Sequence, residues 1–132
     1  MLDMNPLLKC DTYKTCHESM MPNGIERLDS YFVPRKSMLE NQQKIVFFGL
    51  QAFLQKVKDD FEKNFFKVPL DTLKCEYMKY MNIQLGQDVY NIDRVEKLHK
   101  LGYLPLEIES LPEGSLVNMG VPMIHIHNTI PE

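Results

Sequence analysis

The chain has 132 residues, of which 44% are hydrophobic and 25% charged, and its formal net charge is −3. A length of this order fits one domain, and the composition is typical of a folded protein and excludes a disordered one. The acidic balance argues against a nucleic-acid partner, because phosphate neutralisation requires an excess of lysine and arginine. The longest apolar run, residues 45–48, is too short to cross a bilayer.

The three cysteines, Cys10, Cys16 and Cys75, are odd in number and irregularly spaced. This pattern fits neither a disulfide framework nor a zinc site, and it is typical of reduced thiols in the cytosol. The N-terminus lacks the basic stretch and apolar run of a signal peptide. We therefore expect a soluble, cytoplasmic protein with no membrane partner.

The first part of the chain predicts a short helix followed by a strand. Asp11 is a good N-terminal cap and Pro22-Asn23-Gly24 is a strong turn signal, so we expect a helix over residues 13–20. Residues 25–33 alternate in polarity as a strand does. Pro34 ends this strand, because proline cannot donate to a strand ladder.

Amphipathic helices are expected in the middle of the chain. An apolar run, residues 45–48, ends at Gly49, and apolar residues then recur at helical spacing from Leu50 onward. The same spacing predicts helices over residues 70–85 and 92–101. Each of these two is followed by a glycine, which is a common residue at the end of a helix.

The remainder of the chain changes to strand-like patterns separated by turns. Residues 104–111 alternate in polarity, residues 116–117 form a short apolar pair, and residues 123–127 alternate again, with two histidines on one face. With helices in the middle and strands at both ends, we expect an α+β fold, and a single domain over residues 1–132.

The densest group of chemically capable side chains lies in residues 11–17. On a helix Tyr13 and His17 share a face, and an aromatic ring beside Asp11 and Lys14 could hold a planar polar ligand by stacking and hydrogen bonds. The alternative is a capped helix with a half-buried tyrosine and a solvated lysine. Without further context this alternative is favoured.

Two further clusters have both a structural and a functional interpretation. Arg35 and Lys36 lie in a loop after a strand, where phosphate contacts are common, but a solvated basic pair is the simpler interpretation. His125 and His127 share a strand face and could contribute to a zinc site, which would need at least one more ligand. The chain contains neither Gly-x-x-x-x-Gly-Lys nor Gly-x-Gly-x-x-Gly, the two common phosphate-binding glycine motifs.

Several short motifs follow one another in a distinctive order along the chain. They are Asp11-Thr12-Tyr13-Lys14-x-x-His17, Pro22, Ser30-Tyr31-Phe32-x-x-Arg35, Val46-Phe47-Phe48-Gly49-Leu50-Gln51, Leu104-Pro105-Leu106-Glu107-Ile108, Leu111-Pro112-Glu113-Gly114, Gly120 and Asn128-Thr129-x-Pro131-Glu132. This ordered set resembles the opening of nicotinamide phosphoribosyltransferases, from about Leu7 to the last residue. Related nicotinate phosphoribosyltransferases open with an Asp-Leu-Tyr-type motif that lacks the lysine and histidine found here, so the form of this chain favours nicotinamide.

The resemblance implies a reaction and an architecture for the full-length protein. A phosphoribosyl group passes from 5-phosphoribosyl 1-pyrophosphate to the pyridine nitrogen of nicotinamide, and the products are nicotinamide mononucleotide and pyrophosphate, in a salvage route to NAD. The implied plan is that of a type II phosphoribosyltransferase, in which a mixed helix and sheet N-terminal domain precedes an irregular α/β barrel. A homodimer with active sites at the subunit interface is implied, as is Mg²⁺ with the phosphoribosyl donor.

Three residues acquire substrate-binding roles from the resemblance. Tyr13 matches a tyrosine that stacks on the pyridine ring, donated from the neighbouring subunit, and Asp11 lies beside it in the same motif. Arg35 matches a basic residue that contacts the ribose phosphate, also across the interface. We expect no catalytic residue, metal ligand or cofactor site of this segment's own, because the barrel that carries the pyrophosphate site is absent. The isolated chain is therefore expected to be inactive.

The end of the sequence suggests a fragment of a longer enzyme. Pro131 is suited to the first position of a helix and Glu132 to a helix N-terminus, so the sequence indicates that a helix is about to begin and a further element is expected. The alternatives are a nicotinate phosphoribosyltransferase, a stand-alone binding or regulatory module that uses the same domain without catalysis, and a split enzyme whose barrel is a separate chain. The coding sequence after Glu132 would distinguish the enzyme from the stand-alone module.

Overall fold

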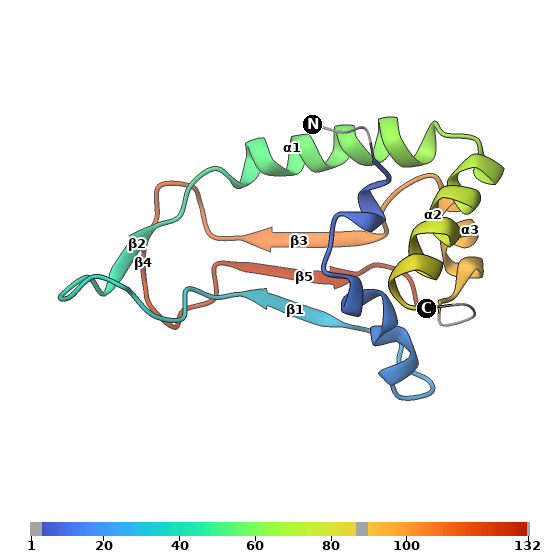
Figure 1. The fold of residues 1–132 in the computed structure, drawn as a ribbon. Helices are drawn as coiled ribbons and strands as arrows, with labels where there is room; N and C mark the ends of the chain where they lie inside the picture. The colour runs from blue at the N-terminus through green and yellow to red at the C-terminus, as the bar shows by residue number, and fades with distance from the viewer. Residues whose placement is uncertain (1–3, 87–89, 132) are drawn as a thin grey trace. The chain divides into compact units, whose positions relative to one another are not determined.

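The computed structural model describes residues 4–86 and 90–131 of the chain. These residues fold into two compact units, each assembled from two separate segments of the chain (Figure 1). The mixture of helices and antiparallel sheets confirms the predicted α+β class. Within the described residues, no helix is both long and apolar enough to cross a membrane. Unit 1 comprises Met1–Asn23 and Leu54–Leu104, and unit 2 comprises Gly24–Phe53 and Pro105–Glu132.

Unit 1 is helical, and several of its helix ends are fixed by side chains suited to that position. Asn5 begins the first turn by accepting the backbone N–H of Leu7 at 3.0 Å. Asn91 caps α3 in the same way through the N–H of Asp93. Gly102 ends α3 with a φ of 78°, a left-handed conformation that glycine adopts without strain. The elements are η1 (Pro6–Leu8), η2 (Thr12–Met20), the later part of α1 (Leu50–Phe61), η3 (Glu62–Phe66), α2 (Leu70–Gln84) and α3 (Ile92–Leu101).

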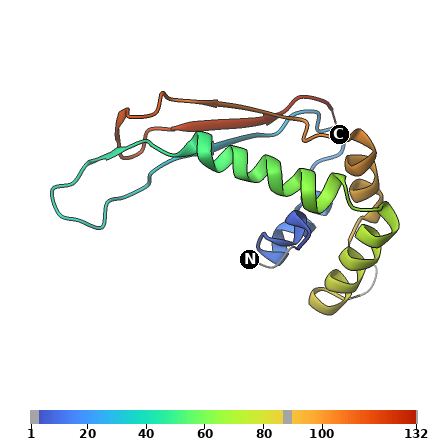
Figure 2. The ribbon, with the colours of Figure 1, turned by 90° about the horizontal axis from the view of Figure 1, so that it is seen from above.

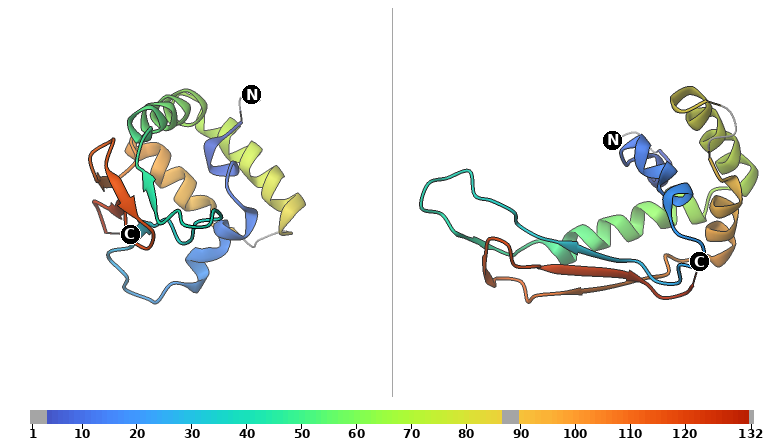
Figure 3. Two further views of the ribbon diagram at one scale, coloured as in Figure 1. Left: turned by 90° about the vertical axis from the view of Figure 1, so that its left-hand side faces the viewer. Right: turned by 90° about the horizontal axis from the view of Figure 1, so that it is seen from below.

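The core of unit 1 lies along one face of α2. Leu73, Tyr77 and Met81 are buried and follow one another at intervals of four residues, the spacing that places side chains on one face of a helix. Figures 2 and 3 show α2 and α3 next to one another, and residues of both helices contribute to the core. The other buried members of this cluster are Leu8, Phe65 and Val95.

Two segments of unit 1 depart from α-helical geometry. The helix predicted over residues 13–20 is a 3₁₀-helix, η2. The Thr15 hydroxyl donates to the carbonyl oxygen of Thr12 at 2.6 Å, and a bond to a carbonyl three residues earlier favours this tighter winding. The continuation of α1, η3, is π-helical, and Phe65 within it is fully buried.

Unit 2 contains two antiparallel sheets. Figures 1 and 2 show the three longer strands side by side in one layer, in the order β1-β5-β3. Tyr31 of β1 pairs with His125 of β5, which pairs on its other side with Glu109 of β3. The strand predicted over residues 25–33 is therefore shorter in the structure. The strands are β1 (Asp29–Phe32), β2 (Lys44–Val46), β3 (Leu106–Ser110), β4 (Leu116–Asn118) and β5 (Ile124–Asn128), with β2 paired to β4.

The core of unit 2 is small, and it lies at the β2–β4 sheet. Phe47, Val117 and Met123 are buried together. The opposite face of the same sheet is apolar but exposed, since Val46 and Leu116 are 60% and 62% exposed. Unit 2 therefore leaves apolar surface uncovered in the isolated chain.

Candidate functional site

The motif with Asp11 and Tyr13 lies at the start of η2 in unit 1. The carbonyl oxygen of Asp11 accepts the backbone N–H of Lys14 at 2.9 Å, which closes the first turn. The Asp11 carboxylate also lies 3.5 Å from the Lys14 ammonium group, and both side chains are more than half exposed. This exposed ion pair adds little stability, so the carboxylate is free to accept hydrogen bonds from a ligand.

Tyr13 presents its ring to solvent. Its side chain is among the exposed large hydrophobic groups, with 61% of the residue accessible. The ring centroid lies 5.6 Å from that of His17, with the two planes inclined by 53°. The prediction that these two residues share a helical face is thus confirmed, and an exposed aromatic ring is suited to stack on a flat ligand.

Arg35 lies in unit 2, in the long loop of residues 33–43 that connects β1 to β2 (Figure 3). The base of the loop is fixed by Gly120, whose backbone N–H donates to the carbonyl oxygen of Pro34 at 2.7 Å. Farther along, the Ser37 hydroxyl and the backbone of Leu39 bond to each other at 3.1 Å. The loop is therefore held in shape by its contact with Gly120 and by its own polar contacts.

The loop encloses an open pocket with a basic side. Arg35 and Lys36 are exposed there, and among the described residues the Arg35 guanidinium forms no ion pair. A free guanidinium beside backbone and amide groups is suited to an anion such as phosphate. The lining residues are Arg35, Lys36, Ser37, Met38, Leu39, Glu40, Asn41, Gln43 and Met119.

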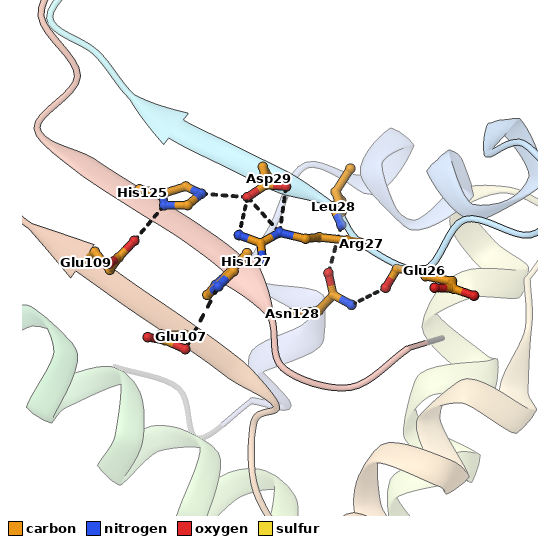
Figure 4. A network of polar contacts seen from close by, with 9 residues as sticks. All are labelled: Glu26, Arg27, Leu28, Asp29, Glu107, Glu109, His125, His127 and Asn128. Carbon is orange, nitrogen blue, oxygen red and sulfur yellow. Dashed lines mark hydrogen bonds and ion pairs between the residues drawn. The ribbon is translucent and has the colours of Figure 1, made fainter.

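A polar network on the three-stranded sheet was not expected from the sequence (Figure 4). Asp29 accepts three contacts from the Arg27 guanidinium at 2.9–3.1 Å, and its Oδ1 lies 2.6 Å from His125 Nε2. The hydrogen bonds from Arg27, and then those from His125, hold the pKa of Asp29 well below its usual range. The other ring nitrogen of His125, Nδ1, lies 2.9 Å from the Glu109 carboxylate.

Asn128 forms a second part of this network through its side-chain amide (Figure 4). Its Oδ1 accepts the backbone N–H of Leu28 at 2.7 Å. Its Nδ2 donates to the carbonyl oxygens of Glu26 and Ile130, each at 2.7 Å. The amide thereby ties the segment before β1 to the segment after β5.

The zinc interpretation of His125 and His127 finds no support in the part of the chain that the structure describes. No group of three or more histidine, cysteine, aspartate or glutamate side chains there could hold a metal ion. His125 contacts carboxylates on both neighbouring strands instead, and His127 Nε2 lies 3.9 Å from Glu107. The signal that could have revealed the network is the alternation of acids in β3 opposite the alternation of histidines in β5.

The comparisons with known proteins agree with the motifs. A family model described as "Nicotinamide phosphoribosyltransferase, N-terminal domain" matches residues 5–108, which include Asp11, Tyr13 and Arg35. The chain is also 42% identical over 135 residues to a protein of Acinetobacter baylyi named nicotinamide phosphoribosyltransferase. That match covers 98% of this chain and 27% of the relative, so the chain spans little more than a quarter of that protein's length. The chain therefore belongs to the nicotinamide phosphoribosyltransferase family, and it corresponds to the N-terminal domain of that family.

Proposed function

We propose that this chain is the N-terminal domain of an enzyme that transfers a phosphoribosyl group from 5-phosphoribosyl 1-pyrophosphate to nicotinamide. The products are nicotinamide mononucleotide and pyrophosphate, in a salvage route to NAD, and the enzyme is a cytoplasmic homodimer. The observation that carries the proposal is the 42% identity to a nicotinamide phosphoribosyltransferase over 98% of this chain. The remaining part of the enzyme supplies the barrel with the pyrophosphate site, so residues 1–132 act as one non-catalytic domain.

Tyr13 is proposed to stack on the pyridine ring of the acceptor. Its 61% exposure in the isolated chain leaves ring surface available for such a contact, and a flat aromatic side chain suits a flat neutral ring. Asp11, in the same turn, is proposed to accept a hydrogen bond from the carboxamide of nicotinamide. The carboxylate of nicotinate would be repelled by Asp11, which favours the amide over the acid.

Arg35 is proposed to bind the 5-phosphate of the ribose. Its guanidinium is exposed and forms no ion pair among the described residues, and its planar donor fork matches a phosphate group. Pyrophosphate departs from a centre with oxocarbenium character, so catalysis depends on positioning and on stabilising charge. Tyr13 and Arg35 would contribute the positioning.

Substitutions in the full-length enzyme test the two roles separately. Tyr13→Ala should weaken the binding of the acceptor, nicotinamide, more than the binding of the phosphoribosyl donor. The loss of ring stacking should cost on the order of 1 kcal/mol beyond the effect of the lost buried area. Arg35→Ala should weaken the binding of the phosphoribosyl donor by roughly 1.5–3 kcal/mol, because it removes a charge-assisted contact to phosphate. Matched controls are Tyr103→Ala, another exposed tyrosine, and Lys44→Ala, an exposed charge that does not line the pocket. Equal effects of each variant on both KM values would refute the assignment.

Mixed dimers test whether both side chains act across the subunit interface. A subunit carrying Tyr13→Ala and Arg35→Ala is paired with a subunit disabled only in its barrel. If the side chains cross the interface, the intact barrel of the double variant receives both from its partner, and about half of the activity returns by site counting. Inactive heterodimers of confirmed composition would place both residues in the active site of their own subunit.

The isolated chain should transfer no phosphoribosyl group to either pyridine substrate, because it lacks the barrel. Formation of nicotinamide mononucleotide by the pure 132-residue chain would contradict this assignment. The assay uses nicotinamide and nicotinate in parallel with 5-phosphoribosyl 1-pyrophosphate and Mg²⁺. In the full-length enzyme, a preference for nicotinate would overturn the acceptor specificity and leave the family membership unchanged.

A further inference from the structure

His125 occupies the centre of the three-stranded sheet and touches both neighbouring strands (Figure 4). Its Nε2 lies 2.6 Å from Asp29 on β1, and its Nδ1 lies 2.9 Å from Glu109 on β3. The side chain of His125 is only 21% exposed, whereas that of Glu109 is 64% exposed. One ring therefore connects all three strands through side-chain contacts.

Both contacts require His125 to carry two ring protons. An ionised carboxylate only accepts hydrogen bonds, so each ring nitrogen must be an N–H donor, and only the imidazolium has two. A neutral ring would turn one nitrogen lone pair toward a carboxylate, which breaks that contact. The two carboxylates, Asp29 first and Glu109 second, raise the pKa of His125 above its ordinary value, in agreement with this geometry.

Strand β1 is held in the sheet by its backbone ladder with β5 and, next to it, by the Asn128 amide, and few side-chain contacts add to this pairing. All four of its residues, Asp29–Phe32, are exposed, so β1 contributes no buried side chain. Among the described residues, its polar and ring contacts with β5 side chains are the Asp29 bond and the Tyr31 ring, which stacks on the His125 ring at 4.7 Å with 9° between the planes. The stack gains from a positive charge on His125, because a cation is attracted to an aromatic face.

We propose that His125 is a proton-dependent clamp that fixes the edge strand β1, and with it the start of the Arg35 loop, in the sheet. When the ring is protonated, β1 and β3 are both tied to β5. Loss of one proton releases one of the two ties, and it also removes the positive charge that strengthens the stack of Tyr31 of β1 on the ring. Val33 and Pro34 alone separate β1 from Arg35, so the clamp acts on the strand that leads into this loop. The importance of that loop rests on the proposed function, whereas the clamp itself does not.

The charged groups around His125 determine the direction of the pH effect. Asp29, Arg27 and Tyr31 face it from β1 or the residues before it, Glu109 faces it from β3, and His127 lies beside it on β5 with a ring distance of 5.2 Å. Glu107 is the next acid on β3 and lies by His127. Because the pKa of His125 is raised on folding, the clamp is complete below the unfolded pKa of ~6.5. It is lost as pH rises through the folded pKa.

The test is an NMR titration of the 132-residue chain. His125 should titrate above ~6.5, and below its pKa both ring N–H protons should exchange slowly. Glu109→Gln should move the pKa back toward ~6.5, because one carboxylate is removed. Glu107→Gln is the matched control, since the same change is made two residues away on the same strand, and it should leave the His125 titration unchanged.

Amide hydrogen exchange then measures how firmly β1 is held in the sheet. Protection factors of the β1 and β5 amides, corrected for intrinsic rates at each pH, should fall as pH rises through the His125 pKa. In His125→Gln this pH dependence should disappear. The clamp would be overturned by a His125 pKa at or below ~6.5. It would also be overturned if the protection factors of the β1 amides did not change as His125 titrates. Neither readout involves catalysis, so failure here would leave the proposed function standing, and failed activity assays would leave the clamp standing.

Discussion

The three hydrogen bonds of the Asn128 amide can be removed selectively, because aspartate has nearly the same shape. In Asn128→Asp one oxygen can still accept the backbone N–H of Leu28. The other carboxylate oxygen replaces the NH₂ group that now donates to the carbonyl oxygens of Glu26 and Ile130 at 2.7 Å. Two donated bonds are lost, and a negative charge is placed against two carbonyl oxygens.

The expected loss of stability is roughly 1–3 kcal/mol. Each lost hydrogen bond contributes about 0.5–1.5 kcal/mol net, and the charge against the carbonyl oxygens places the aspartate variant in the upper half of that range. Asn128→Ala loses all three bonds without adding a charge, and water can reach the freed backbone groups, since these contacts are exposed. We expect the alanine variant in the lower half.

Urea denaturation of the chain, followed by an NMR or fluorescence probe in unit 2, measures these differences. Asn118→Asp is the control, because Asn118 is an exposed β4 residue whose side chain forms no hydrogen bond among the described residues. The deficit of Asn128→Asp relative to the parent chain should shrink as pH falls through the raised pKa of the new carboxyl group, which can then donate one bond. A loss equal to that of Asn118→Asp, or a deficit that does not change with pH, would refute the role assigned to Asn128.

Other changes probe unit 1. Leu73→Ala should cost about 2–5 kcal/mol in urea denaturation, because Leu73 is fully buried in the core. Gly102→Ala should cost about 1 kcal/mol by the same measurement, because φ at this position is 78°. Lys100 and then Lys74 lower the pKa of Glu96 to about 2. The contribution of Glu96 to stability is therefore present above its unfolded pKa, and it is lost as pH falls through the folded pKa. Glu96→Gln should therefore flatten the acid side of the stability curve of unit 1, measured by thermal denaturation.

The helices were predictable because their apolar spacing and their ends agree. The prediction over residues 92–101 matches α3 from end to end, since the apolar stripe and Gly102 indicate the same limits, and the Asn91 cap seen in the structure marks the same start. The segment after Phe61 was not predictable in form, because a π-helical turn has no distinct sequence pattern. The 3₁₀ winding of η2 was not predicted from the sequence either, since α- and 3₁₀-helices share much the same sequence signals.

The residues of the candidate site could be proposed from the sequence, but their structural setting could not be predicted. Local clusters drew attention to Tyr13 and Arg35, but their substrate-binding roles were inferred only because the order of motifs resembles a family, and neither residue type is distinctive alone. The His125 network depends on pairing between residues that are 96 positions apart in the case of Asp29. Periodicity shows which face of a strand a residue occupies, but it does not show which strand lies beside it.

The interleaved order of the two units constrains how the chain can fold during its synthesis. The ladder between β1 and β5 joins residues about a hundred positions apart, as in the pairing of Asp29 with His127. The contact between α2 and α3 needs only residues 70–101. Local helical contacts form faster than distant strand pairs. The helices of unit 1 can therefore begin to fold before β5, the partner strand of β1, has been synthesised. During that interval the exposed and unpaired β1 is the segment most open to chaperones and to mispairing.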